Sequence, residues 1–293
     1  CEIMLRYAAG RIREVKSMAE KLKYFVNGQF RESKTDKWYD LHNPSTGEIT
    51  GQAPCCTNDE VLEAIAAAKA AYPGWSATPA IKRAQILYRV RELILERMDE
   101  LTMSVAKENG KVWAESEGDV LKAKEGTELA TQVPSLMMGE SIMDASRGYD
   151  TVKYREPLGV FAGIVPVNFP AMIPFGWMAP TCIATGNTLV LKAASLTPKT
   201  AMLFAQLYKD AGVPDGVINV VTCSRNEINT ILEHPDVKGI TFVGSTPVGL
   251  KIYEKAAANG KRCQALCQAK NHALVMEDCA LERTVAGVIN SAF

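Results

Sequence analysis

The chain has 293 residues, of which 47% are hydrophobic and 23% charged, enough to bury a large core in one domain or two. Thirty-three basic and thirty-three acidic residues give a formal net charge of zero, so the charge does not indicate a nucleic-acid partner. The most apolar stretch, residues 157–192, is too polar and too often interrupted by proline to span a membrane. We therefore expect a globular, soluble protein that handles small molecules.

Eight cysteines are spread along the chain, several of them inside apolar segments, which indicates reduced thiols and a cytoplasmic location. Cys263 and Cys267 have the spacing of one helix face, but neither a second pair nor a nearby histidine completes a zinc site, and no metal is predicted. Residues 1–17 lack the apolar core and cleavage site of a signal peptide. They form a leader that could be translated upstream sequence or a presequence, with Met18 as an alternative start.

Residues 18–140 are predicted to be mainly helical. Short strands are expected over Tyr24–Phe30 and Trp38–His42, as in an edge sheet. Asn58-Asp59-Glu60 should cap a helix that runs to about Ala71 and stops at Tyr72-Pro73-Gly74-Trp75. Apolar spacing predicts three further helices, from about Pro79, over Asp99–Glu108 and over Glu115–Gln132. Residues 141–157 then alternate polar and apolar side chains around Arg147-Gly148, which is typical of an exposed hairpin.

From residue 158 onward, apolar strands alternate with helices. This alternation predicts a parallel sheet wrapped by helices, a doubly wound, Rossmann-like α/β domain over residues 158–280. Strands are expected at 159–165, 188–192, 217–221, 239–243 and 273–276, and helices from about 171 and over 198–211, 226–233 and 248–258.

Residues at the predicted strand ends suit a bound dinucleotide, because ligands bind at the carboxyl ends of parallel strands. Gly244-Ser245-Thr246-Pro247-Val248-Gly249 follows a strand and opens a helix, so its amides could meet a pyrophosphate, although an ordinary turn would look the same. Lys192 closes an apolar strand and either faces ribose hydroxyls or is a solvated strand end. Ser195 stands where an acidic residue would clamp the ribose and repel a 2′-phosphate, so NADP should be accepted alongside NAD.

Asn168 lies in an apolar wall, directly before Phe169-Pro170. Its side-chain amide could donate a hydrogen bond to an oxyanion. An asparagine before such a turn could also be there only to form the turn, and both interpretations stay open on the residues alone.

Together, the segments VPVNFP (165–170), GNTLVLK (186–192), AGVPDGVINVV (211–221) and TFVGSTPVG (241–249) resemble the aldehyde dehydrogenase superfamily. NFPAMIP, PSLMMGES, EHPDVKGITFVGS and AKNH are similar to its CoA-acylating methylmalonate-semialdehyde dehydrogenases. The resemblance covers about residues 24–293. It implies the NAD(P)-binding domain of that fold, with residues 18–140 as its amino-terminal part, 141–157 as an oligomerisation hairpin and 281–293 as the start of a catalytic domain that is otherwise missing.

The resemblance also implies a reaction, the NAD(P)-dependent oxidation of a short-chain semialdehyde to its acyl-CoA, with coenzyme A as acyl acceptor and a homo-oligomer in the full-length form. Asn168 would donate to the thiohemiacetal oxyanion, and Cys267 would be a wall residue beside the nicotinamide. The cofactor-binding residues implied by the resemblance are Val165, Val167, Lys192, Ser195, Gly244, Ser245 and Cys267.

Three departures from the family pattern bear on this reaction. Leu266 stands where hydrolytic members have a glutamate general base, and because leucine cannot activate water, the thioester would wait for coenzyme A. Lys122 replaces a substrate-binding arginine, which keeps the charge but loses the bidentate fork. The family's catalytic cysteine would lie beyond Phe293, so we expect no aldehyde oxidation by this polypeptide alone. The alternatives are a hydrolytic NADP-linked semialdehyde dehydrogenase and a non-catalytic nucleotide-binding or oligomer-forming fragment.

Overall fold

The computed structural model describes residues 20–269 and 271–292, and the leader predicted at 1–17 lies outside them. Within these residues one seven-stranded sheet has the order β11-β10-β7-β8-β9-β1-β2. Five adjacent strands of this sheet run parallel to one another, which confirms the predicted Rossmann-like α/β domain. These strands are β7 (Val160–Ile164), β8 (Thr188–Lys192), β9 (Ile218–Val221), β10 (Val237–Gly244) and β11 (Arg262–Cys267).

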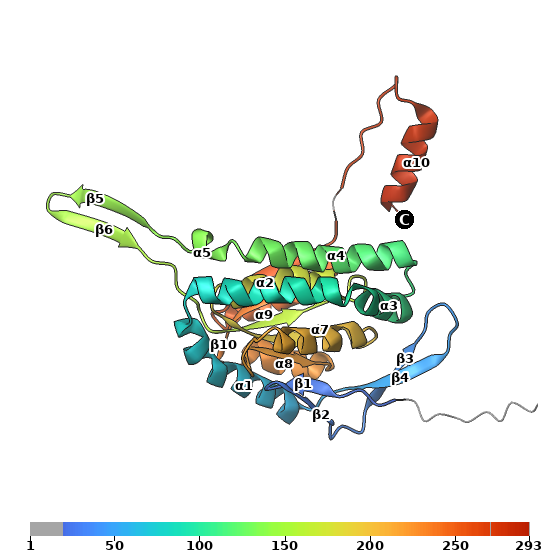
Figure 1. Cartoon of the computed structure of the whole chain (residues 1–293), viewed down its shortest axis with the longest axis horizontal. Coiled ribbons are helices and arrows are strands. Elements are labelled where there is room, and N and C mark those ends of the chain that lie inside the picture. Colours follow the sequence, from blue (N-terminus) through green and yellow to red (C-terminus); the bar gives the residue numbers. More distant parts are fainter. Residues whose placement is uncertain (1–19, 270, 293) are drawn as a thin grey trace, which may run out of the picture.

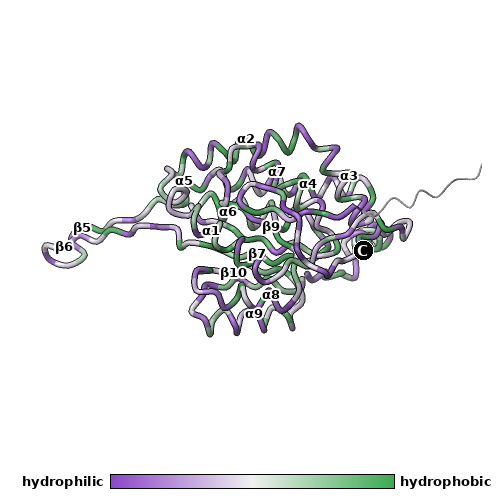
Figure 2. Tube along the Cα trace, turned by 90° about the horizontal axis from the view of Figure 1, so that it is seen from below, coloured by the Kyte–Doolittle hydropathy of each residue, from purple (hydrophilic) through white to green (hydrophobic). Residues whose placement is uncertain are grey.

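Helices cover both faces of this sheet (Figures 1 and 2). One face carries the π-helix η1 (Ile173–Met178), α6 (Ala179–Ala184) and α7 (Lys199–Asp210), with α2 (Ala80–Glu96), α3 (Met98–Asn109) and α4 (Trp113–Ala130) stacked outside them. The other face carries α1 (Asn58–Ala77), α8 (Arg225–Glu233) and α9 (Thr246–Ala258). The apolar residues of the inner strands β8 and β9 are therefore buried from both sides, which is why these strands read as continuous apolar runs.

The first predicted strand is instead a hairpin of two strands. β1 (Tyr24–Val26) and β2 (Gln29–Arg31) are joined by Asn27-Gly28, whose φ angles of 52° and 69° suit a tight two-residue turn. β1 pairs antiparallel with β9, so the hairpin extends the main sheet. β3 (Trp38–His42) pairs with β4 (Ile49–Pro54) in a separate sheet.

Helix α1 begins and ends differently from the prediction. Thr57, not Asn58, is its N-cap, in a capping box with Glu60. The helix continues through Pro73, where it was expected to stop. Its last turn is held by Trp75, whose buried indole donates from Nε1 to Ile183 O at 3.0 Å. We attribute the extra turn to this anchor, which offsets the helical hydrogen bond that proline cannot make.

In the carboxyl-terminal part of the sheet, the structure differs from the prediction at two strands. Residues 273–276 form no strand, and their place in the sheet is taken by β11, which was not predicted. β11 is an edge strand that alternates exposed and half-buried residues, so it lacks the apolar run of a buried strand. Cys263 and Cys267 lie on this strand, which corrects the interpretation of their spacing as a helix face.

The remaining elements lie outside the body of the domain. β5 (Glu140–Ser146) and β6 (Tyr149–Lys153) form the predicted hairpin, which follows α5 (Val133–Leu136), projects away from the sheet and is exposed along both strands (Figure 1). α10 (Leu281–Ala292), which was not predicted, stands apart from the sheet (Figure 1). None of the helices in the described part of the chain is long and apolar enough to cross a membrane.

Candidate functional site

The carboxyl ends of the parallel strands bring most of the predicted cofactor residues to one edge. From β7 the chain proceeds to β8 and β9 on one side and later to β10 and β11 on the other, so the strand order reverses between β7 and β10. Such a switch point is where doubly wound sheets bind ligands. Ile164 pairs with Lys192 on one side and Phe242 on the other, and Gly244 pairs with Cys267.

The turn from β10 into α9 can receive a pyrophosphate. Ser245 is the N-cap of α9, and its side chain accepts no hydrogen bond from the first turn of the helix. The backbone N–H groups of that turn can therefore donate hydrogen bonds to an anion. A Cβ on Gly244 would lie 2.4 Å from the Phe242 ring, and one on Gly249 would lie 2.3 Å from Cys267 Sγ. Glycine at both positions therefore allows the close packing that a dinucleotide turn needs.

Lys192 is a half-buried cation at the end of a strand that is otherwise buried. Burial lowers the pKa of its ammonium group. Among the residues that the structure describes, no carboxylate forms an ion pair with it and no group accepts a hydrogen bond from Nζ. A desolvated charge without a partner is costly, and such a group is a candidate for ligand binding. Ser195 lies half-buried three residues later, in the loop that leads to α7.

Asn168 is exposed in the loop between β7 and η1, and residues from outside the sheet hold that loop. Asn109 Nδ2 donates to Val167 O at 2.8 Å. Lys111 Nζ lies 3.8 Å from the centroid of the Phe169 ring, within cation–π distance. Both residues that flank Asn168 are thus anchored, while its own amide stays open to a ligand.

A buried carboxylate that sequence reasoning missed holds the far end of the same loop. Asp119 on α4 accepts a hydrogen bond from Met172 N at 2.7 Å and forms an ion pair with Lys111 Nζ at 3.1 Å. Its side chain is fully buried, and burial raises the pKa of the carboxyl group. The feature of the sequence that could have indicated this role is the position of Asp119 beside Val120 and Ala123, on the buried side of α4.

The π-helix η1 follows this loop and packs closely against α4. Phe175 O accepts hydrogen bonds from Thr127 Oγ1 at 3.5 Å and Tyr208 OH at 3.4 Å. A Cβ on Gly126 would lie 2.1 Å from Gly176 O, so α4 meets η1 backbone to backbone. Irregular helices of this kind are often found at functional sites.

Two other residues singled out in the sequence lie in more exposed positions. Lys122 Nζ forms an ion pair with Glu125 at 2.7 Å on the exposed side of α4, and within the described residues no hydrogen bond or ion pair joins its side chain to the Asn168 loop. Leu266 is 42% exposed on β11, next to Cys267 and paired with Val243. No cluster of His, Cys, Asp or Glu able to hold a metal is found in the described ranges.

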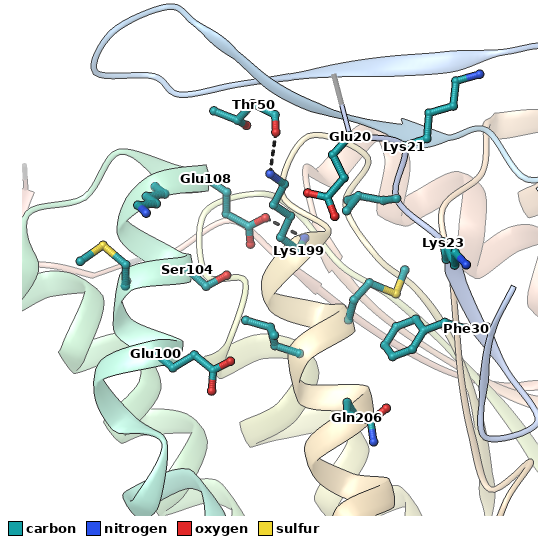
Figure 3. Close-up of a pocket in the computed structure, with 15 residues that line it drawn as sticks. Glu20, Lys21, Lys23, Phe30, Thr50, Glu100, Ser104, Glu108, Lys199 and Gln206 are labelled. Carbon is teal, nitrogen blue, oxygen red and sulfur yellow. Dashed lines mark hydrogen bonds between the residues drawn. The ribbon is translucent and has the colours of Figure 1, made fainter. Parts of the chain in front are cut away.

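A cavity of about 660 Å³ lies elsewhere, between α3, α7 and the amino-terminal strands (Figure 3). None of the predicted site residues lines it. On its wall, the Glu108 carboxylate accepts hydrogen bonds from Lys199 N at 2.8 Å and Thr200 N at 3.0 Å and so caps α7. Burial raises the pKa of Glu108 to about 7. We assign the carboxylate a structural role, since it holds the helix that follows the Ser195 loop.

Known proteins resemble the chain in sequence and in fold. Residues 30–293 match the model of the aldehyde dehydrogenase family. Malonate-semialdehyde dehydrogenase 2 of Geobacillus kaustophilus (strain HTA426) is 46% identical over 274 residues, which cover 94% of this chain and 56% of that protein. The acylating methylmalonate-semialdehyde/malonate-semialdehyde dehydrogenase, mitochondrial, of Rattus norvegicus is 43% identical over 277 residues, 94% of this chain and 52% of that protein.

Among solved structures, the NAD complex of a proposed methylmalonate-semialdehyde dehydrogenase from Sinorhizobium meliloti 1021 aligns with a TM-score of 0.91 at 35% identity. The alignment covers 94% of this chain and 56% of that one. The chain thus spans about half the length of the relatives it matches.

Proposed function

The chain belongs to the aldehyde dehydrogenase family, and we propose that it forms the dinucleotide-binding part of an NAD(P)-dependent, CoA-acylating semialdehyde dehydrogenase. The observation that carries this proposal is that β8 ends in Lys192 and β10 in Gly244-Ser245 at one edge of the sheet, on either side of β7 and the anchored Asn168 loop that follows it. The names of the malonate- and methylmalonate-semialdehyde dehydrogenases support the substrate class, and the word acylating in the rat enzyme's name supports coenzyme A as acceptor.

A nicotinamide dinucleotide fits the residues at this edge. The first turn of α9, with Ser245 and Gly244, would bind the pyrophosphate, and the close approach at Gly249 leaves the turn compact. Lys192 and Ser195 would bind the adenosine ribose, and the unpartnered Lys192 ammonium is the observation that supports this. When bound, the cofactor would accept a hydride from the substrate carbon. The remaining contacts to the dinucleotide would come from the backbone of Val165 and Val167 and from Cys267.

Asn168 would stabilise the oxyanion that forms when a thiolate adds to the aldehyde carbon. Its amide needs a fixed direction to act in this way, and the contacts of Val167 and Phe169 support such a fixed loop. The thiolate would not come from Cys56, Cys182 or Cys223, because burial raises the pKa of each of these thiols to about 12. Lys122 stays our candidate for binding a substrate carboxylate, for which it would have to leave Glu125.

Leu266 decides how the acyl group would leave the enzyme. At this position an apolar side chain cannot take a proton from water, which favours transfer to the thiol of coenzyme A. A hydrolytic, NADP-linked enzyme would need a general base that this residue does not supply. We also propose a cytoplasmic homo-oligomer that pairs through the exposed hairpin β5–β6.

The test has two parts. Calorimetric titration of the 293-residue chain with NAD and NADP should show saturable binding, and binding of neither dinucleotide would refute the cofactor assignment. The full-length enzyme, given malonate semialdehyde and NAD, should form NADH together with malonyl-CoA, or with acetyl-CoA and the carbon dioxide lost from the carboxylate, only when coenzyme A is present. Free acid formed at the same rate without coenzyme A would exclude the acylating reaction.

A further inference from the structure

We propose that Asn109 and Lys111 are positioning residues for Asn168. Together they hold its side-chain amide in the direction that stabilises an oxyanion, without touching the substrate themselves. This inference rests on the proposed function, since it requires Asn168 to act as the oxyanion donor. It goes beyond that function by naming two residues, outside the nucleotide-binding sheet, on which the reaction rate depends.

The turn that ends α3 fixes where these two residues lie. Asn109 is the last residue of α3, and Gly110 ends the helix in the left-handed region with a φ of 79°. Gly110 N donates to Ala106 O at 3.0 Å, and a Cβ on this glycine would lie 2.9 Å from Pro44 Cβ. The positive φ and the close approach both favour glycine here, so Asn109 and Lys111 stand on either side of a turn with a defined geometry.

Each side chain contacts one of the two residues that flank Asn168. Asn109 Nδ2 donates to Val167 O at 2.8 Å, and Lys111 Nζ lies 3.8 Å from the centroid of the Phe169 ring. The residue before the turn thus holds the residue before Asn168, and the residue after the turn holds the residue after it. With both neighbours held, the Cα–Cβ bond of Asn168 keeps one direction, which limits the positions that its amide can take.

Lys111 is in turn fixed by a buried carboxylate. Its Nζ forms an ion pair with Asp119 at 3.1 Å, where the Asp119 side chain is fully buried and that of Lys111 is 18% exposed. The ammonium group cannot move far from the Phe169 ring without leaving this carboxylate unpaired, which is costly. Asn109 differs, because within the described residues its side chain makes no hydrogen bond other than that to Val167 O. Replacing Asn109 therefore removes the loop contact alone.

Loss of this contact should slow the reaction rather than weaken binding. An oxyanion donor acts on charge that develops in the transition state, and a group displaced by about 1 Å can lose about 100-fold in rate. An interaction made only in the transition state contributes to the rate and not to KM. We therefore expect Asn109→Ala to slow NADH formation by the full-length enzyme about 10- to 100-fold in a single turnover. The KM values for NAD and malonate semialdehyde should stay unchanged.

A double-mutant cycle with Asn168 tests the proposal in the full-length enzyme. Asn109→Ala should slow a single turnover strongly when Asn168 is present and little further in Asn168→Ala, because the two residues act as one unit. Lys111→Arg keeps the charge for Asp119 and can stack on an aromatic ring, so it should retain most of the rate that Lys111→Met loses. Lys107→Met, at an exposed lysine of the same helix, is the matched control and should leave the rate unchanged.

The 293-residue chain provides a readout that does not need activity. NMR relaxation should show a lower order parameter for the Asn168 backbone N–H in Asn109→Ala than in the unaltered chain or in Lys107→Met. An order parameter that does not fall would overturn the anchoring of the loop by Asn109.

The kinetic outcomes separate this inference from the proposed function. Additive losses of rate in the cycle, a rate in Asn109→Ala equal to that of the control, or a rise in KM alone would overturn the positioning role and leave the proposed function intact. An Asn168→Ala enzyme as fast as the unaltered one would overturn the oxyanion role of Asn168 and this inference together. A full-length enzyme that forms no NADH from the semialdehyde would overturn the proposed function as well.

Discussion

Met172 donates its backbone N–H to the buried Asp119 carboxylate at 2.7 Å, across 53 positions of sequence. This bond joins α4 to the start of the helical segment that follows Asn168. Asp119 is also the ion-pair partner of Lys111, which lies over the Phe169 ring. The direction of the Asn168 amide therefore depends on a carboxylate that would not itself touch the substrate.

Replacing Asp119 should destabilise the domain. Asp119→Ala leaves Lys111 and the Met172 N–H without their partner in a buried setting, which should lower the free energy of unfolding by about 3 kcal/mol. Urea denaturation followed by circular dichroism measures this change in the free energy of unfolding. The control is Glu125→Ala on the same helix, which breaks an exposed ion pair with Lys122 and should cost less than about 1 kcal/mol. Similar losses in the two variants would contradict the role given to Asp119.

The strand ends could be predicted from sequence, whereas the residues that hold the loops could not. β8 is buried on both sides except at Lys192, so its apolar run and its charged end are visible in the sequence. β11 is an edge strand and has no such run. Asp119 acts on a loop remote in sequence, and only the packing of α4 against η1 makes the contact. The continuation of α1 through Pro73 likewise depends on a residue remote in sequence, Ile183, whose carbonyl accepts the hydrogen bond from Trp75.

Stability should depend on pH through Glu108. Burial raises the pKa of this carboxyl group from 4.5 to about 7 in the folded protein, so between these values the native state keeps a proton that the unfolded chain releases. The free energy of unfolding should therefore fall as pH rises through this window, by at most about 1.4 kcal/mol per pH unit. Urea denaturation at pH 4.5 to 8 should show this slope in the unaltered chain and a flatter curve in Glu108→Gln.

A second carboxylate on α3 provides the control for this pH dependence. The hydrogen bond from Arg97 lowers the pKa of Glu100, so its contribution to stability is present above its unfolded pKa and is lost only as pH falls. Glu100→Gln should therefore lower the free energy of unfolding by the same amount at every pH above about 5, and leave the slope across the Glu108 window unchanged. Parallel curves for the unaltered chain and Glu108→Gln across the window would show that Glu108 does not titrate there.

Gly249→Ala should destabilise the contact between α9 and β11. The new Cβ would lie 2.3 Å from Cys267 Sγ, and such overpacking costs about 1–3 kcal/mol. Adding Cys267→Ala removes the sulfur and should recover part of the loss, measured as the free energy of unfolding in urea. Gly118→Ala is the control, because nothing lies within 4 Å of a Cβ at that position in α4, and a gain of about 0.5–1 kcal/mol is expected. A neutral Gly249→Ala would refute the close approach.

Lys192→Met should stabilise the fold and weaken dinucleotide binding. The substitution removes a desolvated cation that has no partner among the described residues, which should raise the free energy of unfolding by about 1 kcal/mol. Urea denaturation and calorimetric titration with NAD and NADP measure the two effects. Lys82→Met, at an exposed lysine of α2, should change neither. A loss of stability in Lys192→Met would mean that the ammonium has a structural role.

The chain should associate with itself through α10. Leu281, Val285, Val288 and Ile289 are between 42% and 69% exposed, and their spacing places them along one side of the helix. An exposed apolar stripe of this kind favours contact with a second apolar surface. Sedimentation velocity should show species larger than a monomer whose fraction rises with concentration. The double substitution Val285→Glu and Ile289→Glu should reduce that fraction, whereas Arg283→Glu, which alters charge but not the stripe, should not. A monomer at every concentration, or equal effects of the two substitutions, would exclude association through this helix.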